Sequence, residues 1–356
     1  MAKKLELALR KLLVKLLTGG TKVKSSGDLS SEKINKILII RLNRIGDALV
    51  TTPLIKILKQ NLNCEIHLLS DEKNYFVFSN NKDIDKLIVF HKGIKGFNNF
   101  IKLDKIEKYD LIIDAHDDVS TTVSFLVQLS RAPHKLALEK ENKEIFTVTV
   151  PRPDSTNTHV VDRILEIAKP LNINYDKTNL NIIYNLKESS VKFAEKFLQS
   201  MASENNFTIG INISAGSDAR FWGVNRFVKL IEYFKTFNIK LLILTADKDL
   251  TKANEINSLT NVKVFMNKDF DIFAAMVSKL DFLFTPDTSV IHLASAFRIP
   301  VFGIYVKYNT NDIIWYPYKS EFAEITTTEP TLENLDFKEV INKLDPFFNK
   351  ILKKGN

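Results

Sequence analysis

Cysteine is nearly absent from this sequence, because Cys64 is the only one among 356 residues. A single cysteine excludes an internal disulfide framework and is typical of a chain kept in a reducing compartment. Long apolar runs are also missing, since none approaches the roughly 20 residues that cross a bilayer. Lysines and an arginine interrupt the N-terminal leucines, and no small-residue cleavage site follows them, so no secretory signal is expected. These absences predict a cytoplasmic protein.

Glycine-rich nucleotide loops are missing as well. The chain contains no G-x-G-x-x-G, no G-x-x-x-x-G-K-[ST] and no G-x-S-x-G. These gaps argue against a dinucleotide fingerprint, a P-loop and a nucleophile elbow. Cys64 lacks the sequence surroundings of a nucleophile. The acidic stretch DAHDDVS (114–120) has no partner set at metal-ligand spacing, so neither a metal ion nor another cofactor is expected.

Positive charge is in excess, since 50 Lys and Arg against 42 Asp and Glu give a formal net charge of +8. Such an excess favours an anionic partner, which could be nucleic acid, a membrane surface or a phosphorylated substrate. The basic residues are spread along the chain without an RNP-like aromatic pattern, so nucleic acid is the weakest of the three. The length and the apolar fraction of 45% predict a globular protein of two domains.

The chain begins with a basic amphipathic segment. In KKLELALRKLLVKLL (3–17), the leucines fall on one helical face and the basic residues lie opposite. Residues 1–35 are therefore predicted to be a helix and a polar linker. Such a helix can lie in a membrane interface, or it can pack on its own protein or on a partner. The sequence leaves both possibilities open.

From residue 36 onward, short β-branched apolar runs alternate with helical patterns in two series. The first series covers residues 36–185 and begins with KILIIRL (36–42), and the second covers residues 186–330. This order predicts an α/β fold with two Rossmann-like domains, each a parallel sheet covered on both faces. Ligands are expected at the carboxyl ends of the strands, in a cleft between the domains. Residues 331–356 are predicted to form a helix that packs back on the N-terminal domain.

One stretch of the second half leads directly from a strand into a helix. In TPDTSVIHLASAF (285–297), Asp287 or Thr288 can cap the helix, whose first amides form an anion site. His292 lies one helical turn beyond Thr288, on the same face. The alternative is an ordinary capped helix in which His292 fills a polar gap.

Two other strand ends of the second half carry polar loops. In NISAGSDARFWGVNRF (212–227), Ser214 and its small neighbours let a phosphate approach the backbone, and Arg220 can bind phosphate oxygens in pairs. A plain loop with a surface arginine is the alternative. In LTADKDL (244–250), Asp249 can bind the hydroxyl pair of a ribose or cap a helix.

The first half presents acidic residues at two strand ends. In RLNRIGDALVTTPL (41–54), Gly46 is expected to turn the chain sharply from strand to helix and to present Asp47. Asp47 can then face the cleft or simply cap the helix. In DAHDDVS, His116 and Asp117 fit acceptor binding or capping better than a metal site.

In this order, the stretches resemble glycosyltransferase family 9, the bacterial heptosyltransferase family. ILIIRLNRIGDALVTTPLI looks like the first strand, Gly-Asp turn and helix of the family, and NISAGSDARFWGVNRF is similar to its donor-phosphate loop. PDTSVIHLASAF resembles its D-T-G-x-x-H-L-A-A motif, and HVVDRILEIA (159–168) fits a helix that a His and an Arg commonly open. The resemblance runs from about Lys36 to Tyr318. Ser289 stands where the family usually has glycine, and Arg220 replaces the more usual lysine.

The resemblance implies a GT-B architecture and a metal-independent, inverting transferase. Such enzymes typically move a heptose from ADP-heptose onto the lipopolysaccharide inner core at the cytoplasmic face of the inner membrane. By resemblance, Asp47 is the catalytic base. The implied donor-binding residues of the C-terminal half are Ser214, Arg220, Asp249, Asp287, Thr288, Ser289 and His292. The implied acceptor-binding residues of the N-terminal half are Arg44, His116 and Asp117.

Three functions therefore remain open. The first is inverting heptosyl transfer to a lipopolysaccharide or lipooligosaccharide core, by a protein held peripherally on the anionic inner-membrane surface. The second keeps the family but changes the nucleotide sugar and the glycan acceptor, because the motifs read the diphosphate and not the sugar. The third is a non-catalytic protein that binds a nucleotide sugar.

Overall fold

The structure, a computed structural model, describes residues 28–355 apart from 31, 43 and 202–206. The chain divides into two compact units, Met1–Ile183 and Tyr184–Asn356. The boundary thus lies close to the one expected after residue 185. Most of the amphipathic segment predicted for residues 1–35, including the whole predicted helix, lies outside the described residues.

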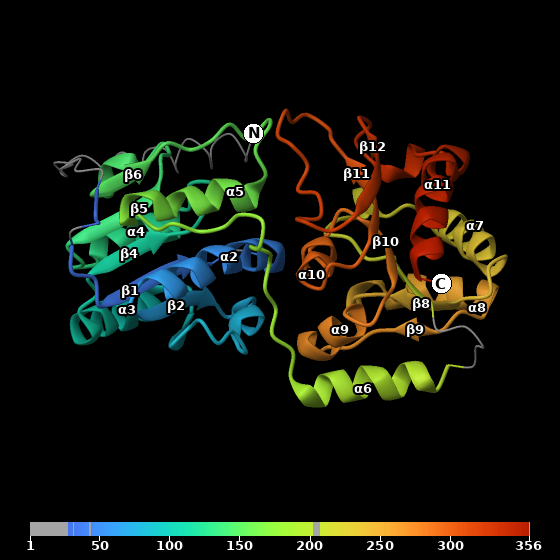
Figure 1. The fold of residues 1–356 in the computed structure, drawn as a ribbon, viewed down its shortest axis with the longest axis horizontal. Helices are drawn as coiled ribbons and strands as arrows, with labels where there is room; N and C mark the ends of the chain where they lie inside the picture. The colour runs from blue at the N-terminus through green and yellow to red at the C-terminus, as the bar shows by residue number, and fades with distance from the viewer. Residues whose placement is uncertain (1–27, 31, 43, 202–206, 356) are drawn as a thin grey trace. The chain divides into compact units, whose positions relative to one another are not determined.

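The first unit is built on a six-stranded parallel sheet with the strand order β3-β2-β1-β4-β5-β6 (Figure 1). Its strands are β1 (Lys36–Arg41), β2 (Glu65–Asp71), β3 (Lys86–Phe90), β4 (Leu111–Asp114), β5 (His134–Leu138) and β6 (Val148–Val150). The central strands are apolar runs that are buried on both faces, which is the pattern of a covered parallel sheet. The parallel sheet expected for residues 36–185 is confirmed.

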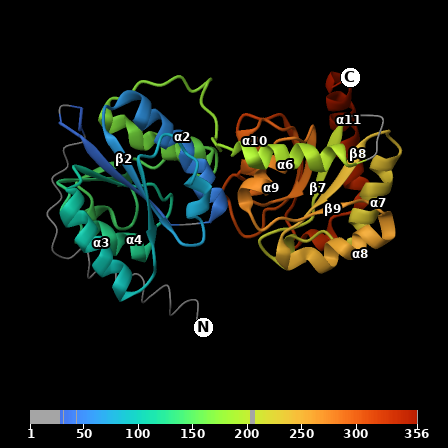
Figure 2. The same ribbon diagram turned by 90° about the horizontal axis from the view of Figure 1, so that it is seen from below.

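Helices cover both faces of the first sheet (Figure 2). One face carries α2 (Ile45–Asn61), α5 (Val160–Leu165) and the 3₁₀ helix η3 (Glu166–Leu171), and the other carries α3 (Ile94–Glu107) and α4 (Thr121–Leu129). The sequence predicted α2 but not α3 or α4. The reason is visible in α3, which buries only Gly96, Phe100 and Asp104, too few apolar positions for a clear helical period.

The second unit is built on another six-stranded parallel sheet, with the order β12-β11-β10-β7-β8-β9. Its strands are β7 (Thr208–Asn212), β8 (Lys240–Leu244), β9 (Val264–Phe265), β10 (Phe282–Pro286), β11 (Val301–Val306) and β12 (Phe322–Thr327). The parallel sheet expected for residues 186–330 is confirmed. The edge strand β12 gives only a weak apolar signal in the sequence, because Ile325 is its only buried residue.

Helices also cover both faces of the second sheet. One face carries α6 (Glu188–Gln199), α9 (Phe270–Val277) and α10 (Val290–Ala296), and the other carries α7 (Val224–Lys235), α8 (Leu250–Thr260) and α11 (Phe337–Gly355). Short 3₁₀ helices complete the fold: η1 (Tyr75–Phe78), η2 (Lys143–Ile145), η4 (Asp218–Arg220), η5 (Asp247–Asp249) and η6 (Leu332–Asn334). Within the described residues, no helix combines the length and apolar character that crossing a bilayer requires.

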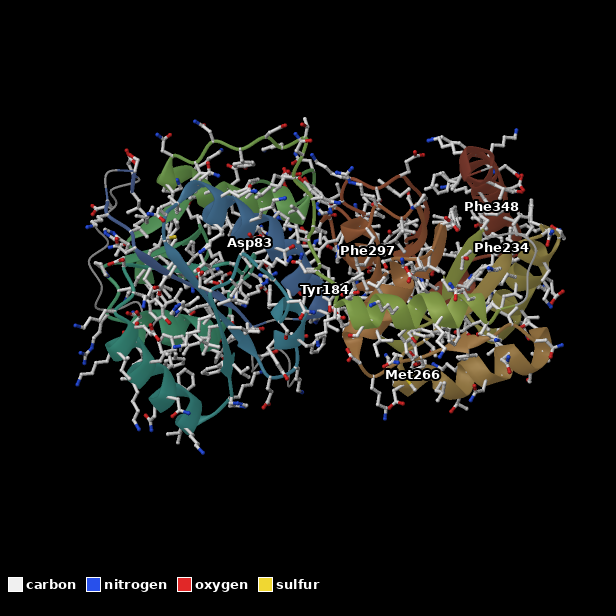
Figure 3. All side chains as sticks on the ribbon, turned by 60° about the horizontal axis from the view of Figure 1, so that its bottom comes forward. Asp83, Tyr184, Phe234, Met266, Phe297 and Phe348 are labelled. Atoms are coloured by element: carbon white, nitrogen blue, oxygen red, sulfur yellow. The ribbon has the colours of Figure 1, made fainter. Side chains whose placement is uncertain are left out.

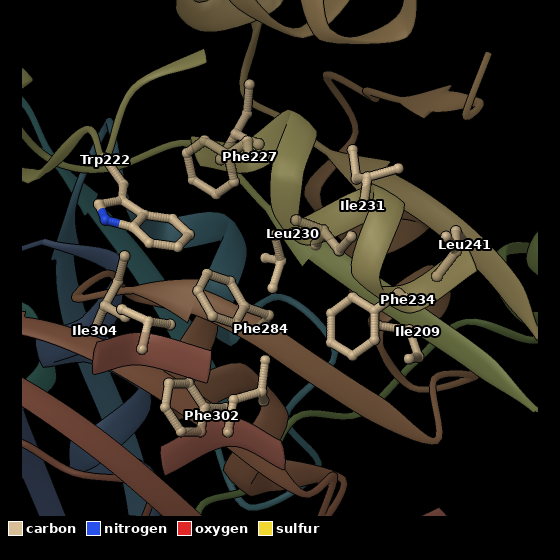
Figure 4. Close-up of a cluster of buried hydrophobic side chains, with 14 of the residues drawn as sticks. Ile209, Trp222, Phe227, Leu230, Ile231, Phe234, Leu241, Phe284, Phe302 and Ile304 are labelled. Carbon is tan, nitrogen blue, oxygen red and sulfur yellow. The ribbon is translucent and has the colours of Figure 1, made fainter. Parts of the chain in front are cut away.

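The core of the second unit contains several aromatic rings (Figure 4). Trp222 packs 5.7 Å from Phe227 and 5.6 Å from Phe284, measured between ring centroids. Its indole Nε1 donates a hydrogen bond of 3.0 Å to the carbonyl of Leu335. Aromatic pairs contribute roughly 0.5–1.5 kcal/mol beyond the area they bury. Trp222 therefore anchors the loop that precedes it, rather than lining a ligand site.

The C-terminal helix α11 belongs to the second unit. Its Phe348 packs against Phe234 of α7 at 5.0 Å between ring centroids (Figure 3), and Val340 and Leu344 are buried in the same core. The expectation that this helix packs on the N-terminal domain is therefore wrong. Its apolar face packs in the layer of helices that covers the second sheet. Amphipathicity alone does not specify which surface such a face packs against.

The two sheets share one topology. Counted from its own first strand, each has the order third, second, first, fourth, fifth, sixth. The order reverses between β1 and β4 in the first unit and between β7 and β10 in the second. Ligands of such sheets bind outside the carboxyl ends of the strands at this reversal point. The cleft expected between the domains stays a prediction.

Candidate active site

A buried arginine lies at the point where the strand order of the first sheet reverses. Arg41 ends β1, and its side chain has no exposed surface. Its Nη1 donates a hydrogen bond of 2.5 Å to the carbonyl of Ala115, which follows β4. Its Nη2 donates to Oδ1 of Asp47 at 2.8 Å, and its Nε donates to the carbonyl of Asp47 at 2.9 Å. One side chain thus ties the ends of β1 and β4 to the start of α2.

Asp47 lies in the first turn of α2 without capping it. The helix begins at Ile45, and Arg44 holds the N-cap position with no side-chain cap hydrogen bond. Gly46 lies inside the helix and not in a sharp turn before it, so both that turn and a capping role for Asp47 are wrong. Oδ1 of Asp47 pairs with Arg41, and no residue in the described part of the chain hydrogen-bonds to Oδ2. The side chain of Asp47 is 18% exposed, which leaves this carboxylate within reach of a ligand.

His116 is buried, and both nitrogens of its ring are engaged. Nδ1 donates to Oδ1 of Asp114 at 2.6 Å, and Nε2 accepts a hydrogen bond of 3.1 Å from the amide of Leu42. Burial lowers the pKa of His116, against the opposing effect of Asp114, and a neutral ring fits both hydrogen bonds. Because the ring has no exposed surface, the expectation that His116 contacts an acceptor is wrong.

Lys140 and Asp114 form a buried ion pair that the sequence did not reveal. The Nζ atom of Lys140 lies 2.7 Å from Oδ2 of Asp114, and it also donates to the carbonyl of His116 at 3.0 Å. Burial alone would raise the pKa of Asp114, but Lys140, and then His116, hold it well below its usual range. The only available signal was that Asp114 ends a fully apolar strand, where a carboxylate needs a partner.

Two arginines from the segment that follows β6 hold Asp117. Arg163 of α5 donates to its two oxygens at 3.1 and 2.7 Å, and Arg152 donates to them at 3.0 and 2.8 Å. Burial alone would raise the pKa of Asp117, but the hydrogen bonds from Arg152 and Arg163 outweigh it and lower the pKa to about 2. Asp117 is 11% exposed and Arg152 is 32% exposed. An acceptor that approached this cluster would meet Arg152 before the carboxylate.

A network of hydrogen bonds between uncharged groups lies at the point where the strand order of the second sheet reverses. Asn212, the last residue of β7, donates from Nδ2 to Oγ1 of Thr285 at 2.9 Å and to the carbonyl of Ser214 at 3.0 Å. The hydroxyl of Ser214 lies 3.1 Å from Oγ1 of Thr245 and accepts the amide of Ala246 at 2.8 Å. Ser214 is thus buried in the support of the loop rather than presented to a ligand.

The structure brings together the two motifs that the sequence placed at neighbouring strand ends. Arg220 in η4 and Asp287 after β10 form an ion pair with 3.1 Å between Nη2 and Oδ2, and both side chains are partly exposed. Burial raises the pKa of Asp287, and Arg220 opposes the rise. The guanidinium is therefore held at the carboxyl edge of the sheet by a carboxylate that is itself poorly solvated.

Two lysines of the α8 region hold the loop that carries Arg220. Lys248 donates from Nζ to the carbonyl of Ala215 at 2.6 Å. Lys252 lies 3.0 Å from Oδ1 of Asp218 and 4.3 Å from the ring centroid of Phe221. The sequence did not single out either lysine, because surface lysines on a helix carry no mark of what they contact.

The start of α10 differs from the expected cap. Ser289 holds the N-cap position without a side-chain cap hydrogen bond, so neither Asp287 nor Thr288 is the cap. Amides before the first hydrogen-bonded turn of a helix have no partner within it. His292 is buried, with its ring centroid 6.0 Å from that of Trp315. Its burial agrees with the alternative in which His292 fills a gap in the fold.

Asp249 is buried before α8 with one oxygen unused. It holds the N-cap position but makes no cap hydrogen bond, so the capping alternative is wrong. In the described structure, its Oδ2 has no hydrogen-bond partner. The nearest ammonium groups are Lys252, 3.5 Å from Oδ1, and Lys248, 3.9 Å from Oδ2. A buried acceptor without a donor is costly, and a ligand hydroxyl would remove that cost.

Metal-ligating side chains are not clustered in the described ranges, where no group of three or more His, Cys, Asp or Glu could hold a metal ion. Arginines and lysines lie at the strand ends of both sheets instead. They offer positive charge without an ion.

Comparisons with known proteins converge on one family. The family model described as glycosyltransferase family 9 (heptosyltransferase) matches residues 101–344. Among curated proteins, lipopolysaccharide heptosyltransferase 3 of Escherichia coli is 24% identical over 315 residues, covering 82% of this chain and 89% of that protein.

Two solved structures resemble most of the chain. A glycosyl transferase family 9 protein from Veillonella parvula has a TM-score of 0.78 at 21% identity, covering 89% of this chain and 98% of that one. The Escherichia coli heptosyltransferase WaaC with ADP has a TM-score of 0.69 at 16% identity, covering 89% of this chain and 99% of that one.

Proposed function

Since the chain belongs to glycosyltransferase family 9 and has the GT-B fold of the solved heptosyltransferases, we propose that it transfers a heptose from ADP-heptose. The proposed acceptor is a lipopolysaccharide or lipooligosaccharide core, and the proposed reaction inverts the anomeric centre without a metal ion. The names of the relatives support the acceptor class, and the ADP in the WaaC structure supports the nucleotide.

The carboxylate of Asp47 is the observation that carries the proposed mechanism. It lies at the reversal point of the first sheet, partly exposed, with Oδ1 held and Oδ2 without a partner in the described structure. A general base must be fixed in position and still have an oxygen available for the proton it takes. The neighbouring candidates do not meet this condition, because both oxygens of Asp117 are occupied and His116 is buried.

The second unit would hold the donor. Arg220 supplies a fork for phosphate oxygens, and the amides of Thr288 and Ser289 supply donors at a helix start. The unused oxygen of Asp249 would accept hydrogen bonds from the ribose hydroxyls. Asp287 lies beside Arg220, where its carboxylate can receive a hydroxyl of the sugar.

The proposed step is a single displacement at the anomeric carbon. Asp47 takes the proton of the acceptor hydroxyl as the oxygen forms its bond to the anomeric carbon. The bond from that carbon to the diphosphate oxygen breaks on the opposite face, and ADP leaves with the electron pair. Arg220 and the helix-start amides stabilise the growing negative charge, which is the task a metal ion performs in other enzymes.

The first unit would hold the acceptor. Arg44 is exposed beside Asp47, and Arg152 is the most open part of the cluster around Asp117. Both suit an anionic, phosphorylated core.

We further propose a peripheral site on the cytoplasmic face of the inner membrane, with residues 1–35 as the contact to anionic lipid. Deleting residues 1–30 should then abolish binding of the protein to anionic liposomes. Unchanged binding would contradict the proposed lipid contact.

A transfer assay tests the proposed reaction. Purified protein is given a panel of nucleotide sugars and a core glycolipid acceptor, and Asp47→Asn is compared with the wild type. We expect transfer from ADP-heptose, and a loss of about 10²–10⁴-fold in kcat for Asp47→Asn, the usual cost of removing a general base. Asp83→Asn is the control, because Asp83 comes just before β3 and so lies toward the amino ends of the strands of the same sheet.

The panel also separates the alternatives. Full activity in Asp47→Asn would contradict the role of Asp47 as base. Transfer from another nucleotide sugar would keep the family chemistry and change the substrate. Tight binding of a nucleotide sugar with no turnover of any donor would support a non-catalytic binding protein.

A further inference from the structure

The buried guanidinium of Arg41 contacts Asp47 twice. Its Nη2 binds Oδ1 of the carboxylate at 2.8 Å, and its Nε binds the backbone carbonyl of the same residue at 2.9 Å. Its third hydrogen bond goes to the carbonyl of Ala115 at 2.5 Å. A side chain that is held through both its own oxygen and its backbone has little freedom to rotate.

Arg41 is suited to a permanent contact. A guanidinium stays protonated in proteins, and its planar fork fixes direction as well as charge. The side chain has no exposed surface, so water does not compete for its hydrogen bonds. This pair therefore differs from the surface ion pairs of the chain, which contribute little and rearrange freely.

The same contact leaves the other half of the carboxylate open. Oδ1 faces the arginine, while Oδ2 has no hydrogen-bond partner among the residues that the structure describes. The arginine therefore selects which oxygen of Asp47 can meet a hydroxyl. Fixing a reacting group in this way contributes to rate through orientation.

Another buried carboxylate of the same unit shows that a structural role does not require an arginine. Asp104 of α3 is buried, and neutral groups hold it: the hydroxyl of Ser130 donates at 2.6 Å and the amide of Arg131 at 2.9 Å. The C-terminal end of α3 leads into the amino end of β4, so Asp104 lies away from the carboxyl edge.

We propose that Arg41 is a positioning residue for the transfer reaction, which orients Asp47 and keeps Oδ2 directed to the acceptor hydroxyl. This inference rests on the proposed role of Asp47 as base. It assigns to Arg41 an effect on the rate of the chemical step and none on the binding of the donor.

The test compares Arg41→Met and Arg41→Lys with the wild type in the full-length protein. We expect Arg41→Met to lower kcat by about 10- to 100-fold, the size of effect produced by a misplaced catalytic group. The Kd for ADP, measured by titration calorimetry, should not change. Arg41→Lys keeps the charge but not the fork, and it should recover part of the lost kcat. Asp104→Asn is the control, with an expected loss of thermal stability and an unchanged kcat.

The outcomes separate this inference from the proposed function. If Asp47→Asn loses transfer while both Arg41 variants keep the wild-type kcat, the positioning role is overturned and the base remains. A fall in kcat that follows melting temperature alone, with no recovery in Arg41→Lys, also overturns it. Full activity in Asp47→Asn overturns the base and the positioning role together. If Arg41→Met does not fold, Arg41→Lys and Arg41→Gln provide the same comparison.

Discussion

The two units share a strand order but treat charge at the carboxyl edges of their sheets in opposite ways. In the first unit, Asp114 and Asp117 are paired with buried or half-buried cations, and both have lowered pKa values. In the second unit, burial raises the pKa of Asp287, and one oxygen of Asp249 has no hydrogen-bond partner in the described structure. The first edge pairs Asp114 and Asp117 with cations of its own unit, whereas the second leaves Asp249 and Asp287 short of partners.

This difference indicates a division of labour. An edge whose charges are already paired is rigid and can hold the proposed base, Asp47, in a fixed direction. An edge with an exposed guanidinium and an underused carboxylate gains most when a ligand supplies the missing partners. The first edge is therefore suited to fixing the proposed base, and the second is suited to the proposed binding of a nucleotide diphosphate.

The largest effect on stability is expected at the carboxyl edge of the first sheet, where Asp117 is paired with two arginines. Asp117→Asn should lower the free energy of unfolding of the first unit by about 2–3 kcal/mol at pH 7, because a carboxyl pKa near 2 instead of the usual 3.8 stabilises the ionised form in the fold. Because the folded pKa is lowered, this contribution is complete above about pH 4 and disappears as the pH falls through about 2. Urea unfolding at pH 7 and at pH 3 measures it.

The control for that measurement is Asp118→Asn. Asp118 is an exposed neighbour of Asp117, so its replacement should change stability by less than about 0.5 kcal/mol. Equal effects of the two substitutions would contradict the pairing described for Asp117.

A smaller effect, on binding rather than on stability, is expected at the carboxyl edge of the second sheet. Arg220→Ala should weaken ADP binding by about 10- to 100-fold, the usual worth of a hydrogen bond to a charged group. Arg220→Lys should lie between the alanine variant and the wild type, since it keeps the charge and loses the fork. Titration calorimetry measures the Kd, and an unchanged value in Arg220→Ala would place the diphosphate elsewhere.

The smallest effect should have the opposite sign. Since burial raises the pKa of Asp287, the ionised side chain destabilises the fold at neutral pH, and Asp287→Asn should raise the melting temperature of the second unit. The gain should shrink as the pH falls toward about 4, where an unfolded aspartate also takes up its proton. An equal or lower melting temperature at pH 7 would show that the pair with Arg220 stabilises the fold.

The sequence predicted most of the fold because its central strands are continuous apolar runs. Stretches such as KILIIR (36–41) are recognisable without any knowledge of their neighbours. It did not indicate β12, α3 or α4, whose few buried side chains give little periodicity. The prediction that α11 packs on the first unit was wrong, because an amphipathic pattern does not indicate which surface the apolar face covers.

The sequence placed the candidate residues at the strand ends, but it did not indicate which side chains hold them there. Arg220 and Asp287 were expected at neighbouring strand ends, and the structure pairs them. The buried partners Arg41, Lys140 and Arg163 were missed, because a charged residue in a sequence looks exposed until its counter-ion comes close in the fold. His116 was misjudged for the same reason.

Amide hydrogen exchange with and without ADP tests the contrast between the two edges most directly. We expect ADP to protect the three loops of the second unit, residues 213–223, 246–249 and 287–289, which carry Arg220, Asp249 and the amides at the start of α10. Protection of residues 41–48 of the first unit, with no change in those three loops, would contradict it.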